Sequence, residues 1–163
     1  MTSGDGRGDE RGDGRDVGKG IARVARRLQV YRTDAIEVTF DPNRYTHFAA
    51  CVRTLPAVFD AKARPWIRPS AASPEQIADV VALCPTGALH ARRADGAPAE
   101  SVPPEVTVVA SRNGPLYVRG DVEVALEDGT TVVRDVRVAL CRCGKSAMQP
   151  LCDGSHRAAG FVA

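Results

Sequence analysis

The sequence predicts an α+β protein in which a small α+β unit is followed by a small β-rich domain that ends in a cysteine-containing loop. A capped helical segment begins at Ser73, and alternating strand patterns dominate from residue 105 onward. A stretch rich in Ala, Pro, Gly and Glu separates the two parts. The expected divisions are therefore a disordered tail at 1–20, an α+β domain at 21–94, a linker at 95–104 and a β-rich domain at 105–163.

The N-terminal tract reads MTSGDGRGDERGDGRDVGKG and has almost no apolar side chain to bury. Because such a tract cannot offset the entropy cost of ordering, we expect disorder over 1–20. Apolar residues at helical spacing, with arginines between them, follow at 21–28, and a strand should begin near Leu28. Residues 35–40 then alternate as a strand, and Thr33-Asp34 supplies the turn of a hairpin.

The clearest helix start is Ser73, because Pro74 takes the first helical position and Gln76 stands three residues after the cap. Helical spacing from Ile77 onward places Cys84 on the buried face, and Pro85 stops the helix. Residues 88–91 then predict a returning strand, which completes the α+β unit.

The β-rich part consists of short alternating segments with turn residues between them. Asn113-Gly114-Pro115 and Asp128-Gly129 predict turns. The expected strands are 106–110, 116–118, 122–126, 132–133 and 136–140, and the last of them leads directly into Cys141. We therefore expect a small sheet whose end presents the cysteine loop.

Composition narrows the class of protein. The net charge of +2 gives no reason to expect a nucleic-acid or membrane partner, and neither an apolar membrane span nor a secretory signal is visible. We therefore expect a cytoplasmic protein. Aromatic residues make up only 5% of the chain, so its core side chains are small. Five cysteines, three of them crowded at one end, favour metal ligation over disulfides in a reducing compartment.

The C-terminal loop carries a metal-ligand pattern: Cys-x-Cys, eight residues, Cys, three residues and His. Buried core cysteines would follow strand or helix periodicity and would not stand beside Gly, Lys and Asp. Structural zinc usually has two residues between paired cysteines, and so does a thioredoxin-like redox pair, whereas this loop has one. Zinc stays open as the alternative metal.

The loop resembles the CDGSH iron–sulfur domain, the mitoNEET-like family. That pattern has two cysteines one residue apart, a Ser or Thr three residues later, a proline two before the third cysteine, and then Cys-Asp-Gly-Ser-His. Every position is present here: Cys141, Cys143, Ser146, Pro150, Cys152, Asp153, Gly154, Ser155 and His156. The resemblance implies one [2Fe–2S] cluster per chain, held by Cys141, Cys143, Cys152 and His156.

The chemistry of these residues agrees with that implication. Thiolates suit iron–sulfur cores, and one neutral imidazole makes the centre less negative, which raises its reduction potential. Because His156 must be deprotonated to act as a ligand, we expect the cluster to be acid-labile. A helical turn after Cys152 would direct its amide dipoles at the cluster. Lys145, Asp153 and Ser155 either hydrogen-bond the ligands or only shape the loop.

Residues 31–89 resemble the divergent single-cluster ferredoxin domain, so the first unit is expected to be ferredoxin-like. The matching segments are 51–56, 58–60, 64–66 and the Cys-Pro-Thr-Gly-Ala-Leu run from Cys84. That family has a first cysteine six residues before the second, and Tyr45 takes its place here, while His47 lies two positions away. With only Cys51 and Cys84 left, we expect a vestigial site and no second cluster. The alternative is a facultative metal or redox site.

The sequence thus predicts a non-enzymatic [2Fe–2S] protein that transfers electrons, passes on its cluster or senses redox state. A zinc-stabilised interaction module is the alternative function. A redox or cluster-transfer protein is the expected partner. The resemblance to single-motif CDGSH proteins implies that this protein forms a homodimer. The fused first domain could instead take the place of the second subunit. His90 is expected to be a surface residue and not a ligand.

Overall fold

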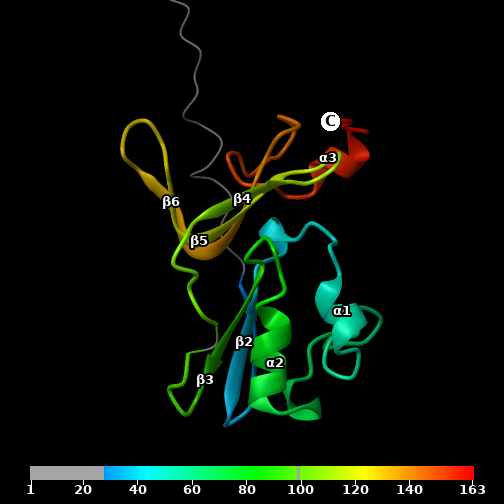
Figure 1. Ribbon diagram of the computed structural model, residues 1–163. Helices are drawn as coiled ribbons and strands as arrows, with labels where there is room; N and C mark the ends of the chain where they lie inside the picture. The colour runs from blue at the N-terminus through cyan, green and yellow to red at the C-terminus, as the bar shows by residue number, and fades with distance from the viewer. Residues whose placement is uncertain (1–27, 99) are drawn as a thin grey trace, which may run out of the picture.

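The computed structural model describes residues 28–98 and 100–163. The expectations for the tail at 1–20 and for the basic segment at 21–27 lie outside this range. Figure 1 shows two lobes, each built on its own three-stranded sheet, with sheet orders β1-β2-β3 and β4-β5-β6. The mixture of small sheets and short helices confirms the α+β class. No helix of the described ranges is long and apolar enough to cross a membrane.

The first sheet is antiparallel throughout and contains β1 (Gln29–Arg32), β2 (Ile36–Phe40) and β3 (Leu89–Arg93). The predicted hairpin is confirmed, because Thr33 Oγ1 accepts a hydrogen bond from the Ile36 amide in the turn between β1 and β2. β2 is the central strand, which explains why its apolar positions are almost completely buried. β3 starts one residue later than predicted and runs two residues further.

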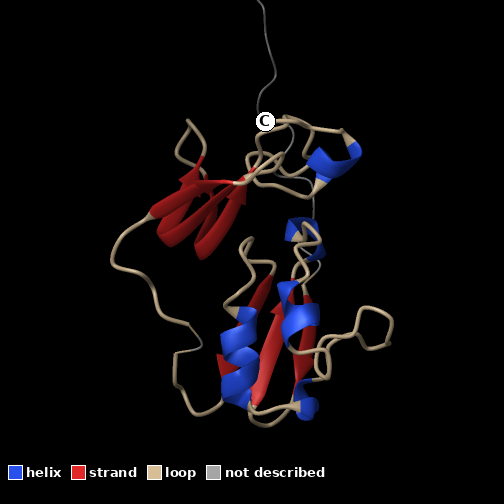
Figure 2. Cartoon of the chain, turned by 45° about the vertical axis from the view of Figure 1, so that its right-hand side comes forward, coloured by secondary structure: helices blue, strands red, loops and turns tan. Residues whose placement is uncertain are grey.

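Four short helices accompany this sheet: η1 (Pro42–Arg44), α1 (Ala50–Thr54), η2 (Pro69–Ala71) and α2 (Pro74–Val81). Figures 1 and 2 show α2 against the sheet and η1 at the end of β2 that faces the second lobe. The capping box predicted at Ser73 is present in both directions, since its hydroxyl accepts from the Gln76 amide and the Gln76 side chain accepts from the Ser73 amide. The apolar face of α2 packs into the first core.

The helical spacing predicts Cys84 on α2, but the structure places it after the end of this helix. The helix ends at Val81, and the Cys84 amide bonds the Val81 carbonyl in a tighter three-residue turn. Pro85 has no amide hydrogen and prevents the helix from continuing. The half-buried Cys84 side chain instead lies 3.5 Å from Thr86 Oγ1 in the turn that leads to β3.

The second sheet contains β4 (Thr107–Ala110), β5 (Leu116–Ala125) and β6 (Thr131–Leu140), again antiparallel. The sequence predicted two short strands in place of each of the long strands β5 and β6. A register shift at 119–122 allows β5 to continue through Gly120, whose φ is +143°. A Cβ at Gly120 would lie 2.8 Å from Val106 Cγ2, so only glycine permits this bulge.

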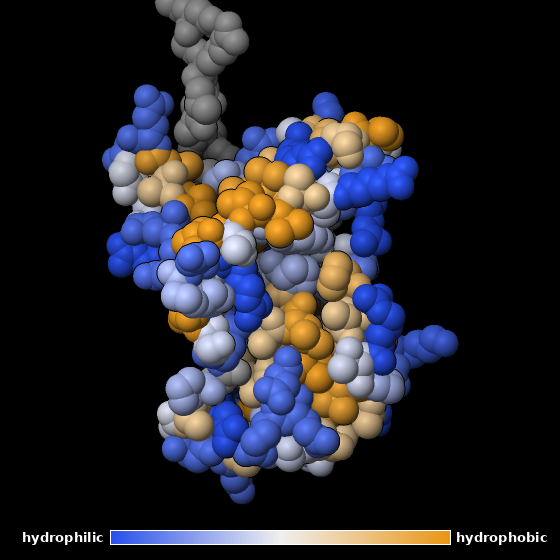
Figure 3. All heavy atoms as spheres, in the orientation of Figure 1, coloured by the Kyte–Doolittle hydropathy of each residue, from blue (hydrophilic) through white to orange (hydrophobic). Residues whose placement is uncertain are grey.

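The core of the second lobe is small and is completed by the cysteine loop itself. Val118, Val133 and Val138 come from the sheet, while Met148 and Leu151 come from the loop. Val108 and Val109 on the edge strand β4 remain exposed, and so does Val106 just before this strand. Figure 3 shows a hydrophobic patch over this part of the sheet. Folding of the loop and packing of the sheet are therefore interdependent.

A buried arginine joins the two lobes. Arg137 on β6 is only 1% exposed and extends into the first lobe. Its guanidinium donates to the carbonyls of Val81, Cys84 and Leu89 at 2.7–2.8 Å. Its Nε lies 2.8 Å from a carboxylate oxygen of Glu100, which balances the charge. A guanidinium has five N–H donors in a fixed plane, so one side chain can satisfy this many acceptors.

A second buried pair lies beside it. Arg44 Nη1 donates to Asp135 Oδ2 at 2.7 Å, and Arg44 Nη2 donates to the Arg137 carbonyl at 2.8 Å. His90 Nε2 lies 3.0 Å from the same Asp135 oxygen. The His90 side chain is 41% exposed, so it is half at the surface as expected, with an interdomain partner that the sequence did not reveal. These contacts fix the β6 strand on the first lobe.

Candidate metal centre

The cysteine loop begins where β6 ends and turns back against the same strand. The Cys141 amide donates to the Pro150 carbonyl at 2.9 Å, and the Cys152 amide donates to the Ala139 carbonyl at 2.8 Å. Leu140 and Leu151 form an antiparallel bridge between these two bonds. Residues that are eleven positions apart in the chain are therefore held side by side by the backbone.

This arrangement brings the predicted ligands together in two pairs. The Sγ atoms of Cys141 and Cys143 are 3.7 Å apart, and Cys152 Sγ lies 3.4 Å from His156 Nδ1. The first pair comes from one turn, and the second pair is brought together by the short helix α3 (Ser155–Ala158). Each pair has the separation of two ligands that can share one metal atom.

Backbone amides donate to the sulfur atoms of both pairs. The Lys145 amide lies 3.4 Å from Cys143 Sγ, and the Gly154 amide lies 3.4 Å from Cys152 Sγ. Gly154 has φ +90°, and a Cβ there would meet Thr46 Cα and the Tyr45 carbonyl at 3.4 Å. The glycine thus permits both the left-handed turn and the close approach of the first lobe. N–H donors of this kind stabilise thiolate charge.

The thiols differ in how easily they ionise. Burial alone would raise the pKa of Cys141, but the amides of Ser146 and Gly144 and the Cys143 side chain outweigh it, and the pKa is lowered. Burial raises the pKa of Cys152 to about 11, the Gly154 amide opposes this, and the nearby Cys141 thiolate adds to the increase. The two pairs thus influence one another electrostatically. Thiols that oppose one another's ionisation fit a cationic iron core, which would hold all of them ionised.

His156 is prepared to act as a neutral ligand. The residue is only 8% exposed. Burial and the charge of Arg157 lower the pKa of His156, and Asp153 opposes them. Neutral imidazole can offer a lone pair to a metal, whereas imidazolium cannot. On its other side the ring approaches the 113–115 turn, since a Cβ on Gly114 would lie 3.6 Å from His156 Nε2.

The three polar residues singled out from the sequence have different roles. Lys145 contacts Cys143 through its amide. The Asp153 carboxylate accepts from the amides of Ala147 and Ser155 at 2.9 and 3.0 Å, so Asp153 shapes the loop. Ser155 takes part in that contact through its backbone.

The Ser146 hydroxyl braces the loop further, and its fixed position in the motif was the only sequence signal for it. It donates to the Leu151 carbonyl at 2.7 Å and accepts from the Met148 amide at 3.0 Å. The loop therefore keeps its shape through side-chain contacts as well as through the backbone pairing with β6.

Contacts from outside the loop could not be predicted from the motif. Arg157 donates to the His47 carbonyl at 3.3 Å across the lobes, and Phe48 stacks edge-on against Tyr117 with ring centroids 6.1 Å apart. Arg142 donates to the Ser111 carbonyl and lies over the Phe161 ring. The metal loop thus lies directly against residues 45–48 of the first lobe.

The candidate second site lies at this junction. Cys51 and Cys84 both line a small cavity, together with Tyr45 and the buried Thr46. Burial and then the nearby Cys84 raise the pKa of Cys51 to about 11, so this thiol stays protonated at neutral pH. The Tyr45 ring packs against Phe40 at 5.5 Å and contributes to one wall. Of the residues described, those lining the cavity include no other cysteine.

Comparisons with known proteins agree with both parts of the chain. Residues 113–157 match the family described as iron-binding zinc finger, CDGSH type, and residues 31–94 match the family described as divergent 4Fe-4S mono-cluster. The chain is 34% identical to the uncharacterized protein YjdI of Escherichia coli strain K12 over 62 residues, which are 38% of this chain and 82% of YjdI. YjdI of Escherichia coli O157:H7 matches to the same extent.

These matches confirm the resemblances drawn from the Cys141–His156 loop and from the Cys51 and Cys84 segments. The iron–sulfur family matches the first lobe, and the iron-binding CDGSH family matches the second. The chain is an iron–sulfur cluster-binding protein that belongs to the CDGSH-type family in its C-terminal domain and to the divergent 4Fe-4S mono-cluster family in the domain before it.

Proposed function

We propose that the protein binds one [2Fe–2S] cluster through Cys141, Cys143, Cys152 and His156 and serves in electron transfer, cluster transfer or redox sensing. The observation that carries this proposal is the pairing of the ligands: two sulfur atoms 3.7 Å apart beside a sulfur and an imidazole nitrogen 3.4 Å apart. One pair for each of two metal atoms fits a two-iron core better than a single ion.

When bound, such a cluster supplies a one-electron redox couple. The chain supports it in three ways. The amides of Lys145 and Gly154 donate to ligand sulfurs and favour the thiolate state. The burial of His156 keeps the imidazole neutral, and the buried Cys152 side chain is shielded from water. The contacts of β6 with the first lobe hold the strand from which the loop starts.

We propose further that the protein is not an enzyme and that it works in the cytoplasm with a redox or cluster-transfer protein as its partner. In the part of the chain that the structure describes, the side chains around the ligand pairs are thiols, amide-bonded polar groups and core residues. The Cys152 thiol and the His156 imidazole lie 3.4 Å apart, and the proposal assigns both to the metal and not to nucleophilic catalysis. The zinc-stabilised module remains the alternative function, because three thiolates and one imidazole are also a zinc ligand set.

Metal analysis of the chain purified under anaerobic conditions separates these functions. The proposal predicts about two irons and two acid-labile sulfides per chain, with a rhombic or axial EPR signal after one-electron reduction. Replacing Cys143 by Ser should remove most of the iron, while replacing Cys51, which lies outside the loop, by Ala should leave it unchanged. One zinc per chain, without iron or sulfide, would establish the alternative.

A further inference from the structure

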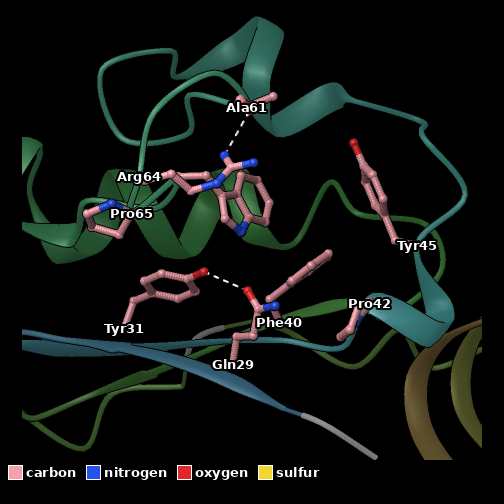
Figure 4. Close-up of a pocket in the computed structure, with 9 residues that line it drawn as sticks. Gln29, Tyr31, Phe40, Pro42, Tyr45, Ala61, Arg64 and Pro65 are labelled. Atoms are coloured by element: carbon pink, nitrogen blue, oxygen red, sulfur yellow. Dashed lines mark hydrogen bonds between the residues drawn. The ribbon is translucent and has the colours of Figure 1, made fainter.

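A cavity of about 440 Å³ opens in the first lobe and shares the lining residue Tyr45 with the cavity of Cys51. Figure 4 shows its lining side chains, which come from β1, the end of β2, the segment at 42–45 and the loop at 61–66. Neither the family matches nor the proposed cluster function assigns any role to this space. The lining residues are Gln29, Tyr31, Phe40, Pro42, Tyr45, Ala61, Arg64, Pro65 and Trp66.

Four of the nine lining residues are aromatic. Phe40 is buried and lies at the centre of the group, with its ring edge-on to Trp66 at 4.8 Å and to Tyr45 at 5.5 Å. Tyr31, Tyr45 and Trp66 are only half-buried, although each packs against the first core. They therefore leave part of their surface on the cavity. Half-exposed aromatic walls of this kind favour a flat, aromatic ligand, because stacking adds to the burial of apolar area.

The charge of the cavity is positive. Of the described lining residues, Arg64 alone carries a full charge, and no carboxylate within the described ranges lies at ion-pair distance from it. Among the described residues, its hydrogen bonds go to the Ala61 and Ala63 carbonyls, and both use Nη1. Nε and Nη2 remain as donors, and a guanidinium keeps its charge at all physiological pH values.

Neutral hydrogen-bonding groups stand opposite the arginine. The Tyr31 hydroxyl donates to Gln29 Oε1 at 2.7 Å, which fixes the Gln29 amide at the rim of the cavity. Figure 4 shows the Arg64 guanidinium above this pair, with Tyr45 on the far side of the opening. The cavity therefore offers aromatic walls, one unpaired cation and an oriented amide.

We propose that this cavity binds a small planar aromatic molecule that carries an anionic group, with its ring against the aromatic wall and its anion on Arg64. The fit rests on charge complementarity and wall chemistry, so it does not depend on the cluster. The cavity also lies close to the metal loop. Tyr45 lines both this cavity and the Cys51 cavity, and a Cβ on Gly154 of the metal loop would lie 3.4 Å from the Tyr45 carbonyl.

The test uses FMN and riboflavin, which share one ring system and differ by a phosphate. Trp66 is the only tryptophan of the chain, so its fluorescence reports binding at this cavity directly, and equilibrium dialysis gives an independent affinity. We expect FMN to quench Trp66 saturably and to bind about tenfold more tightly than riboflavin, which corresponds to one charge-assisted contact. Arg64→Gln should remove that difference, while Arg64→Lys should keep part of it.

Arg68→Gln is the matched control, because Arg68 is also exposed but does not line the cavity, and it should preserve the preference for FMN. Far-UV circular dichroism checks that each variant folds. If Arg64→Gln fails to fold, the comparison of FMN with riboflavin on the wild-type chain decides alone. Absence of saturable binding, equal affinity for the two flavins, or a preference that survives in Arg64→Gln would each overturn the proposal.

Discussion

The guanidinium of Arg137 donates a 2.7 Å hydrogen bond to the backbone carbonyl of Cys84, across the junction between the two lobes. The donor is on the strand that leads into the metal loop, and the acceptor belongs to the turn that holds the candidate second site. Arg137 also satisfies the carbonyls of Val81 and Leu89. One side chain therefore connects the region of the candidate second site to the ligand loop.

Replacing Arg137 by Met should destabilise the protein by at least about 3 kcal/mol, because three buried carbonyls and Glu100 lose their donor at once. Urea unfolding followed by circular dichroism measures the loss. Arg119 is a matched control, since it spans the lobes through one bond, to the Ala82 carbonyl. Arg119→Met should cost about 1 kcal/mol or less. Equal losses for both variants would contradict the assigned role of Arg137.

The buried Asp135 carboxylate should make stability depend on acid pH. Burial opposes ionisation, but His90 and Arg44 outweigh it and lower the pKa of Asp135 to about 2 from 3.8. Because the pKa of Asp135 is lower in the folded chain than in the unfolded chain, its ionised carboxylate stabilises the folded state by about 2 kcal/mol when the pH is above the unfolded-state pKa. This contribution disappears as pH falls from about 4 toward 2.

The measurement for Asp135 is the difference in urea midpoint between the wild type and Asp135→Asn. It should be large at pH 6 and shrink below pH 4. Visible absorbance, recorded in parallel, shows which samples have lost the cluster. Wild type and variant are compared only where both have kept it or both have lost it. Glu123→Gln, in the exposed pair with Arg134, serves as the surface control and should have little effect at any pH. A constant difference for Asp135→Asn down to pH 2.5 would argue against the buried pair.

His156→Cys should retain the colour of the cluster and lose it more slowly in mild acid. Imidazole leaves a metal when it is protonated, whereas a thiolate ligand resists protonation more strongly. The measurement is the rate of loss of visible absorbance at pH 5 in the wild type and the variant. Because the burial of His156 already lowers its pKa, we expect wild-type loss to accelerate only below the ordinary histidine range. Identical rates would exclude the histidine as a ligand.

The double variant Cys51→Ala with Cys84→Ala should keep the iron content and visible spectrum of the wild type. Its two thiols line a small cavity with Tyr45 in place of a third cysteine, and the pKa of Cys51 is raised toward the protonated state. Colorimetric iron analysis measures the outcome. A wild-type value near five or six irons per chain, falling to about two in the double variant, would reveal a live second cluster.

The local structure of this chain was largely readable from its sequence. The capping box at Ser73 and the hairpin turn at Thr33 depend on neighbouring residues, so propensity and spacing sufficed to predict them. The ligand pairs were predictable for the same reason, because all four residues come from one short loop. The continuity of β5 was missed, since a bulge at Gly120 looks like a turn in the sequence.

The contacts between the lobes could not be predicted. Arg137 looked like one of many polar residues on a strand, and only the fold brings three carbonyls within its reach. The same holds for Gly154, whose close approach to Thr46 depends on how the lobes are packed. The sequence predicts that Tyr45 takes the place of a ligand, but its position between two cavities follows only from the structure.

The most direct test of the central claim is the visible spectrum of the purified chain, taken with iron and sulfide counts before and after addition of dithionite. The account predicts a red-brown protein with about two irons and two sulfides per chain, whose colour bleaches on reduction and is lost when Cys152 is replaced by Ser. A colourless protein that holds one zinc per chain would contradict it.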